Sequence, residues 1–214
     1  MTGATGYMGR RLTRELVRRG HVVRALVRPG SEGKLAAGCE AVAGDALNAA
    51  TFQERVAPAD TFVQLVGVAH PSPAKAEQFR TVDLASVRAS AAAAAAAGVE
   101  HFVYVSVAHP APAMQAYIAV RAEGEALIRA AGLHATILRP WYVLGPGHRW
   151  PIVLIPAYWL AERLPATRDT ARRLGLVTLE QMAGALVDAV EHPAKSVRIV
   201  EVPEIRRAPV DLPF

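Results

Sequence analysis

The sequence predicts an α/β fold of the doubly wound class, in which helices cover both faces of a parallel sheet. Three observations carry this prediction. Short apolar runs alternate with longer helical stretches, a glycine-rich loop opens the chain, and 52% of the 214 residues are hydrophobic while only 20% are charged. Nearly continuous apolar strands are typical of parallel sheets that are buried on both faces. The strand–helix–strand crossovers are expected to be right-handed.

The predicted elements follow in order along the chain. Strands are expected at residues 21–27, 39–44, 61–68, 101–107, 135–140 and 196–202, and helices at 8–19, 49–56, 74–97, 117–131 and 179–191. Residues 141–170 interrupt this alternation, because they hold four prolines and all three tryptophans. We therefore predict one domain over residues 1–214, with 141–170 as a small aromatic-rich C-terminal lobe or lid that binds substrate. The alanine-rich run before Gly98 predicts a buried helix or a dimer interface, so a monomer and a homodimer both stay open.

Composition narrows the class of protein. The formal net charge of +5 favours anionic ligands such as phosphates, but the basic residues are scattered, so nucleic acid is not expected as a partner. The single cysteine, Cys39, excludes an intramolecular disulfide and favours a reducing compartment. We see neither a signal peptide nor an apolar run long enough to span a membrane, so a cytoplasmic location is expected. The histidines lack metal-ligand spacing, and no metal is expected.

The chain opens with the sequence MTGATGYMGR, which predicts a loop that binds a dinucleotide pyrophosphate. In such a loop the first glycine permits a tight turn, the second lets the backbone approach the phosphates, and the third lets the next helix pack on the sheet. The free N–H groups and the positive dipole end of that helix would face the phosphates. The expected cofactor-binding residues here are Gly3, Thr5, Gly6, Tyr7, Met8 and Gly9.

Arg28 ends the second predicted strand, at the place where folds specific for NAD hold an acidic residue for the ribose 2′-hydroxyl. An arginine cannot accept that hydrogen bond, but it can pair with a 2′-phosphate. The sequence therefore favours NADP(H), with NAD(H) as the alternative. Further cofactor contacts are expected from Asp45 and Ala46 after the third strand, Gly67 at the end of the fourth and Pro140 at the end of a later strand.

The first strand of the sheet is expected to be missing or very short. A glycine loop of this kind normally follows a buried central strand, and here only Met1 and Thr2 precede it. One explanation is a start assigned at an internal GTG codon, which encodes valine elsewhere. Without that strand, both of its neighbours have backbone groups without partners. We therefore expect a first strand that is absent or at most two residues long.

Several segments together resemble a known family. TGATGYMG, RALVR, GD, AAGVEHFVYVS, GLHATILRP and EVPEI occur in the order found in atypical or extended short-chain dehydrogenases/reductases. These are NAD(P)H-binding Rossmann proteins related to nucleotide-sugar epimerases, nitrogen-repressor-like redox sensors and a complex I accessory subunit. The resemblance covers nearly the whole chain, and it implies the superfamily rather than a substrate.

The resemblance also implies a catalytic pair. The family has a Tyr and, four residues later, a Lys that supports the tyrosine as acid or base and holds the cofactor ribose. This chain has Tyr117 and Arg121, and the guanidinium is not a conservative replacement. Ser106 matches a serine of the family motif, although the usual hydroxyl position comes slightly later. His109 and His70 are the alternatives for proton donation, and an exposed loop histidine is the simpler interpretation of each.

Two functions follow from these features. The first is an NADPH-dependent oxidoreductase that acts on a carbonyl, a quinone or a nucleotide-sugar-like substrate. The second is a non-catalytic dinucleotide-binding protein, either a redox sensor or an assembly factor. The aromatic residues of 141–170 favour a hydrophobic small-molecule substrate, while packing into the lobe's own core and peripheral contact with a membrane surface are the alternatives.

Overall fold

The structure is a computed structural model, and it describes residues 1–147, 153 and 155–209. Its main sheet is parallel and has the order β3-β4-β5-β8. These strands are β3 (Thr61–Gln64), β4 (His101–Val105), β5 (His134–Arg139) and β8 (Val197–Glu201). A second parallel pair consists of β1 (Val23–Val27) and β2 (Cys39–Ala43). All six predicted strands are present, and the predicted doubly wound α/β class is confirmed.

The first two residues join these two sheets. Thr2 forms a parallel bridge with Gln64 of β3. On the other side, the amide of Leu26 in β1 donates to the carbonyl oxygen of Met1 at 2.8 Å. Met1 and Thr2 therefore lie between β1 and β3, where the first strand was expected. This agrees with the prediction of a first strand that is absent or at most two residues long.

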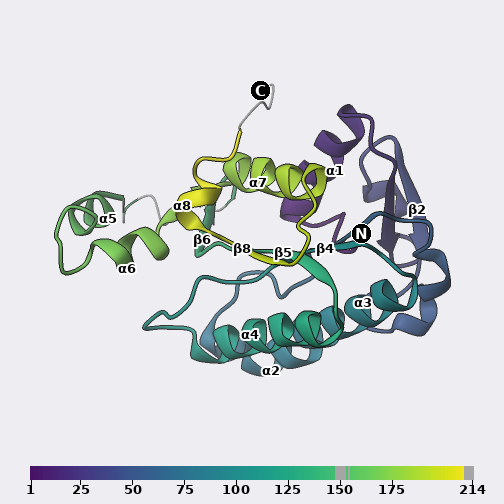
Figure 1. Cartoon of the computed structure of the whole chain (residues 1–214), viewed down its shortest axis with the longest axis horizontal. Helices are drawn as coiled ribbons and strands as arrows, with labels where there is room; N and C mark the ends of the chain where they lie inside the picture. Colours follow the sequence, from purple (N-terminus) through teal and green to yellow (C-terminus); the bar gives the residue numbers. More distant parts are fainter. Residues whose placement is uncertain (148–152, 154, 210–214) are drawn as a thin grey trace.

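Helices cover both faces of the sheet (Figure 1). On one face lie α1 (Tyr7–Arg18) and α7 (Leu179–Glu191), and on the other lie α2 (Ala76–Gln78), α3 (Ala85–Ala96) and α4 (Gln115–Ala130). Each face has its own apolar core, one built around Phe79, Phe102 and Ile137 and one around Leu12, Met182 and Leu186. A capping box of Thr178 and Gln181 starts α7, which satisfies the first amides of that helix.

Two predicted helices differ from expectation. Residues 49–56 form two short 3₁₀ turns, η2 (Ala49–Thr51) and η3 (Gln53–Arg55), on either side of the buried Phe52. A segment this short does not sustain an α-helix without tertiary packing along its length. The predicted helix 74–97 is divided into η4 (Pro73–Lys75), α2, a π-helical segment η5 (Phe79–Leu84) and α3. π-Helical turns inside helices occur frequently at functional sites.

The region 141–170 extends away from the sheet. It contains β6 (Tyr142–Leu144), α5 (Ile155–Ala161) and part of α6 (Arg168–Arg173), and Figure 1 shows α5 and α6 projecting at one end of the molecule. β6 pairs in parallel with β7 (Leu176–Thr178), and α8 (Val202–Ile205) follows β8. Trp150, one of the predicted lobe aromatics, lies outside the described residues. In the part of the chain that the structure describes, no helix combines the length and the apolar character needed to cross a membrane.

Candidate dinucleotide and catalytic site

The glycine loop is closely packed against the end of β3. Gly3 has φ +74°, and a Cβ there would lie 2.8 Å from the backbone carbon of Leu65. A Cβ on Gly9 would lie 2.1 Å from the carbonyl oxygen of Gly3. Gly6 differs, because its Cβ would meet only that same oxygen, at 3.2 Å. The packing of the chain explains Gly3 and Gly9, whereas the open side of Gly6 is the cradle that a bound phosphate would fill.

Helix α1 begins directly at this cradle. Its N-cap is Gly6, and no side chain caps the helix. The first turn contains no acidic residue, so the amides of Tyr7, Met8 and Gly9 present positive partial charge without a competing carboxylate. Thr5 is half-buried beside them. This donor set fits a pyrophosphate, and it is the chemistry that the sequence predicted for the loop.

Arg28 and Asp45 follow β1 and β2 at the same edge of the sheet. Arg28 is exposed, and within the described residues it forms no ion pair. Its guanidinium is therefore available to a 2′-phosphate. Asp45 is also exposed, but its Oδ1 accepts from the amide of Leu47 at 3.0 Å, which closes a local turn. Ala46 is half-buried in that turn, and Pro140, after β5, is buried.

Arg121 is buried at the same edge of the sheet, where the strands end and the cofactor is expected to bind. Its side chain is 7% exposed, its Nη2 lies 2.6 Å from Oδ1 of Asp83, and its Nη1 donates to the carbonyl of Val105 at 2.9 Å. A Cβ on Gly67 would lie 2.3 Å from this guanidinium, so Gly67 provides the room that the arginine needs. Gly67, which is predicted to contact a ribose, thus also has a structural role.

The charge of Arg121 is secured by its neighbours. Burial alone lowers the pKa of a guanidinium, but Tyr117, Tyr104 and Asp83 outweigh that effect and raise the pKa of Arg121 above its usual range. The guanidinium carbon lies 5.0 Å from the ring centroid of Tyr117 and 5.7 Å from that of Tyr104. Both distances fit cation–π contacts. Arg121 therefore stays protonated and faces the predicted catalytic tyrosine.

Tyr117 is held at the start of α4. Its ring packs at 57° against Phe79 of the π-helical segment, with the centroids 4.9 Å apart, and the residue is half-buried. The structure thus brings the predicted pair Tyr117 and Arg121 together. It places Asp83, which the sequence analysis did not single out, next to them. The predicted helix 74–97 also contains Glu77, so no signal in its sequence distinguished Asp83.

Ser106 belongs to a different cluster. Its hydroxyl donates to Oε1 of the buried Glu125 at 2.7 Å. Arg139 donates to the same carboxylate, and Nε2 of His109 lies 3.6 Å from it. Burial raises the pKa of Glu125, but hydrogen bonds from Arg139 and Ser106 lower it by more, so the pKa of Glu125 lies below its usual range. The Ser106 hydroxyl is therefore occupied, and its assignment to catalysis stays a prediction.

A chain of buried polar contacts links the first strand to Arg121. Thr2 donates to Oε1 of Gln64, whose Nε2 donates to Ser86 at 2.8 Å. The hydroxyl of Ser86 in turn donates to the backbone carbonyl of Asp83 at 2.9 Å. Buried networks of this kind fix the positions of their members. The placement of Thr2 is consequently coupled to the position of the Asp83–Arg121 pair.

Comparison with known proteins agrees with this geometry. Residues 3–193 match the NAD(P)H-binding family. The chain is 31% identical over 209 residues to a ceramide reductase of Caulobacter vibrioides, and this match covers 97% of this chain and 64% of the relative. It is 28% identical over 167 residues to a 4-hydroxy-2-methyl-3-oxo-4-farnesyl-3,4-dihydroquinoline-1-oxide ketoreductase of Stigmatella aurantiaca, which covers 68% of this chain and 50% of that protein. The chain thus spans between half and two thirds of the length of these relatives.

Solved structures support the same fold. A short-chain dehydrogenase/reductase superfamily protein from Agrobacterium tumefaciens with bound NAD has a TM-score of 0.67 at 19% identity, covering 94% of this chain and 76% of that one. The enzyme WbmH of Bordetella bronchiseptica, in complex with NAD+, has a TM-score of 0.68 at 17% identity, covering 96% and 77%. The resemblance seen in the sequence is confirmed. The chain belongs to the NAD(P)H-binding family and has the Rossmann fold of the short-chain dehydrogenases/reductases.

Proposed function

We propose that this protein is an NADPH-dependent reductase whose substrate carries a carbonyl group and a large apolar portion. The observation that carries this proposal is the charged, buried Arg121 stacked on Tyr117 at the cofactor edge. The preference for NADPH over NADH rests on the exposed Arg28 at the end of β1. Both named relatives are reductases, which supports the reaction type.

The proposed chemistry assigns one role to each residue. A dinucleotide held by the Gly3–Gly9 loop would supply the hydride for the carbonyl carbon. Tyr117 donates the proton to the carbonyl oxygen. Arg121 stabilises the negative charge that develops on Tyr117, and Asp83 holds Arg121 in place through the 2.6 Å ion pair. The product is the corresponding alcohol.

The aromatic region 141–170 supports an apolar substrate and is proposed as its lid. Trp141 and Tyr158 pack with Ile118 against a small core formed by Ala108, Ala111 and Leu174. Ile118 is the chain neighbour of Tyr117, so this contact places part of the lobe close to Tyr117. Val153, Trp159, Leu160 and Leu164 remain exposed, and Trp159 is 57% exposed. The names of both relatives, a ceramide reductase and a farnesyl-quinoline ketoreductase, denote substrates with long apolar chains.

The exposed apolar side chains also support contact of this lobe with a membrane surface. Arg163 covers the ring of Trp159 at 3.2 Å, and such pairs of aromatic and basic residues suit a lipid interface. Flotation with anionic liposomes, comparing the wild type with Trp159→Ser, tests this part of the proposal.

A non-catalytic redox sensor or assembly factor is the second candidate. It is favoured by the burial of Arg121 and by the engagement of Ser106 with Glu125, which leave neither group open to a substrate. In that case the protein would bind NADPH without turnover.

The test is an NADPH oxidation assay with ketones of increasing alkyl chain length and with a quinone. We expect wild-type turnover to rise with chain length and Tyr117→Phe to lower it by about 10²–10⁴, the usual contribution of a positioned acid. Tyr104→Phe is the matched control, because Tyr104 also flanks Arg121 but, at 1% exposed, is too deeply buried to reach a substrate. No oxidation with any acceptor would favour the sensor, whereas turnover that Tyr117→Phe leaves unchanged would remove Tyr117 from the proposed mechanism.

A further inference from the structure

The loop between β3 and η4 crosses the carboxyl edge of the sheet. Its first residues touch the glycine loop, because a Cβ on Gly3 would lie 2.8 Å from the backbone carbon of Leu65. Further along, a Cβ on Gly67 would lie 2.3 Å from the guanidinium of Arg121, which stacks on Tyr117. The loop therefore runs from the expected pyrophosphate site to the proposed proton donor.

Two charged side chains hold the far end of this loop. Oδ2 of Asp83 accepts from the amide of Val68 at 3.0 Å. The Nζ of Lys75 donates to the carbonyl oxygen of Ala69 at 2.6 Å and to that of His70 at 3.0 Å. Hydrogen bonds from or to charged groups are stronger than neutral ones. The backbone on both sides of Ala69 is thus fixed by contacts with residues later in the chain.

His70 is held in a left-handed backbone conformation, with φ +50°. Within the described ranges, Met114 is the other non-glycine residue with positive φ. Met114 has a local reason for it, since it is the N-cap of α4 and its carbonyl accepts from the amide of Ile118 at 2.9 Å. His70 instead precedes Pro71, and a residue before proline prefers extended backbone. Left-handed residues that cost free energy in this way cluster at binding and active sites.

The position of His70 suits contact with a substrate. Val68 and Tyr117 both pack against the core built around Phe79 and Phe102. The Cα of His70 lies within about 7 Å of the Cα of Val68, because two residues cannot span more. His70 is exposed at this edge, and a neutral imidazole has one hydrogen-bond donor and one acceptor. A compact polar group bound near Tyr117 is therefore within the range of His70.

We propose that His70 is a substrate-binding residue, whose imidazole hydrogen-bonds a hydroxyl or amide group next to the carbonyl that Tyr117 protonates. Lys75 is the positioning residue, because it holds the backbone of His70. A site that hydrogen-bonds a polar group of its substrate rejects analogues that lack this group. His70 thus selects ketones with a polar neighbouring group over plain ketones. This inference rests on the proposed reductase function.

The experiment measures NADPH oxidation with two ketones of equal alkyl chain length, one plain and one with a hydroxyl group on the carbon next to the carbonyl. In His70→Ala, kcat/KM for the hydroxyketone should fall by about tenfold, chiefly through KM, because one hydrogen bond is lost. For the plain ketone the change should be less than about threefold. His70→Asn should retain most of the preference, because asparagine tolerates a left-handed φ and keeps a donor and an acceptor.

Lys75→Met tests the positioning role. The carbonyls of Ala69 and His70 lose their shared donor, so this variant should show the same rise in KM for the hydroxyketone. Lys195→Met, at an exposed lysine before β8, is the matched control and should leave both ketones unaffected. Fluorescence titration should give the same NADPH affinity for His70→Ala and the wild type. Weaker NADPH binding by His70→Ala would assign His70 to the cofactor and overturn the inference.

The melting temperature separates a binding role from a structural one. His70→Gly relieves the left-handed conformation and should melt about 2 °C or more above His70→Ala, yet lose the hydroxyketone preference as fully. A structural role predicts instead that the more stable variant is the more active one. Wild-type kinetics for both ketones in these variants would overturn the inference and leave the reductase function intact. Absence of NADPH oxidation by the wild type would overturn the proposed function, and this inference with it.

Discussion

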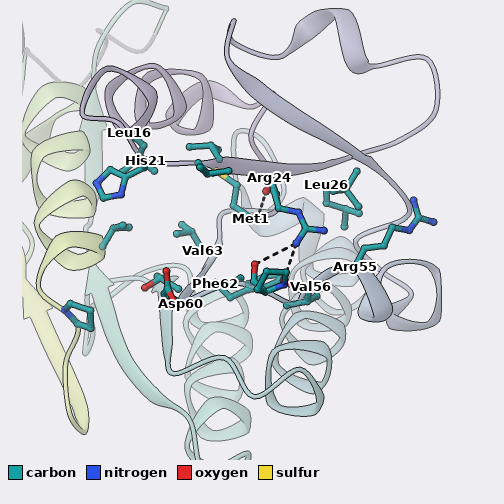
Figure 2. A pocket seen from close by; sticks show the side chains of 18 of the residues that line it. Met1, Leu16, His21, Arg24, Leu26, Arg55, Val56, Asp60, Phe62 and Val63 are labelled. Carbon is teal, nitrogen blue, oxygen red and sulfur yellow. Dashed lines mark hydrogen bonds between the residues drawn. The ribbon is translucent and has the colours of Figure 1, made fainter.

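The two ends of the sheet around β1 and β3 are built in opposite ways. At the carboxyl end, Gly3, Gly9 and Gly67 are positions where even one added carbon would collide with backbone or with Arg121. At the amino end, the same two strands border a cavity of about 590 Å³. One end is filled to contact distance around the glycine loop and Arg121, whereas the other is open and lined by both apolar and polar side chains (Figure 2).

We assign different roles to the two ends. The groups that we propose for cofactor binding and proton transfer lie at the carboxyl end, as expected for an open parallel sheet. The amino end contributes stability. The chain of contacts from Thr2 through Gln64 and Ser86 to Asp83 connects the two ends. Substitutions of the groups that would contact cofactor or substrate should mainly change turnover and affinity, whereas substitutions of buried groups at either end should also change the free energy of unfolding.

The largest effect is expected from breaking the ion pair at the carboxyl end. Arg121→Ala leaves the carboxylate of Asp83 buried without its partner, which should lower the free energy of unfolding by about 3–5 kcal/mol. Arg121→Lys keeps the charge but cannot reproduce both contacts of the guanidinium, so its loss should be smaller. Urea unfolding of both variants measures this. Arg121→Ala as stable as the wild type would show that the pair contributes nothing to the fold.

The cofactor preference is the next effect in size. Arg28→Asp should remove a charge-assisted contact with the 2′-phosphate and weaken NADPH binding by about tenfold to hundredfold, while NADH binding holds or improves. Fluorescence titration with both cofactors measures the change. Arg14→Asp, an exposed site on α1 with the same change in charge, is the control and should alter both affinities equally. Unchanged affinities in Arg28→Asp would make Arg28 a surface residue only.

The amino end can be probed by pH. Folding lowers the pKa of the Met1 amino group from 8.0 to about 5, so the folded chain binds fewer protons than the unfolded chain between these values. Stability should therefore rise with pH across this window. His101, whose pKa burial lowers from 6.5 to about 4, contributes the same trend only at lower pH. Between pH 6.5 and 8 the rise should be about 2 kcal/mol or less and belong to Met1.

Acetylation of the Met1 amino group is the control for this pH effect. The acetylated chain cannot titrate there, so its unfolding free energy should be flat between pH 6.5 and 8. An identical slope in the acetylated and the free chain would assign the dependence to another group.

The smallest effect on turnover is expected for Ser106, which lies within the carboxyl end. Ser106→Ala removes one hydrogen bond to the ionised Glu125 and should lower the free energy of unfolding by about 1–3 kcal/mol. Turnover per folded molecule should stay within about threefold, because the hydroxyl is not available to the substrate. A loss of turnover comparable to that of Tyr117→Phe would return Ser106 to the catalytic centre.

The sequence predicted most of the sheet and the glycine loop, because strand periodicity and glycine spacing are local signals. The resemblance to the family also predicted the pairing of Tyr117 with Arg121, which lie four residues apart on one helix. It did not predict the partners of these residues. Asp83 reaches Arg121 from a π-helical segment, and Glu125 on α4 meets Ser106 directly after β4. Such contacts arise from tertiary packing, which a single sequence does not encode as a pattern.

The most direct test compares two buried carboxylates. We assign Asp83 to the catalytic site and Glu125 to the stability of the fold. Each is replaced by its isosteric amide, as Asp83→Asn and Glu125→Gln, and NADPH-dependent turnover is measured per folded molecule as a function of pH. The account predicts that Asp83→Asn lowers turnover at least about tenfold and shifts the pH profile, since Arg121 is held less firmly beside Tyr117. Glu125→Gln should lower the melting temperature and leave turnover and its pH profile unchanged. Loss of turnover in Glu125→Gln with full activity in Asp83→Asn would contradict the account.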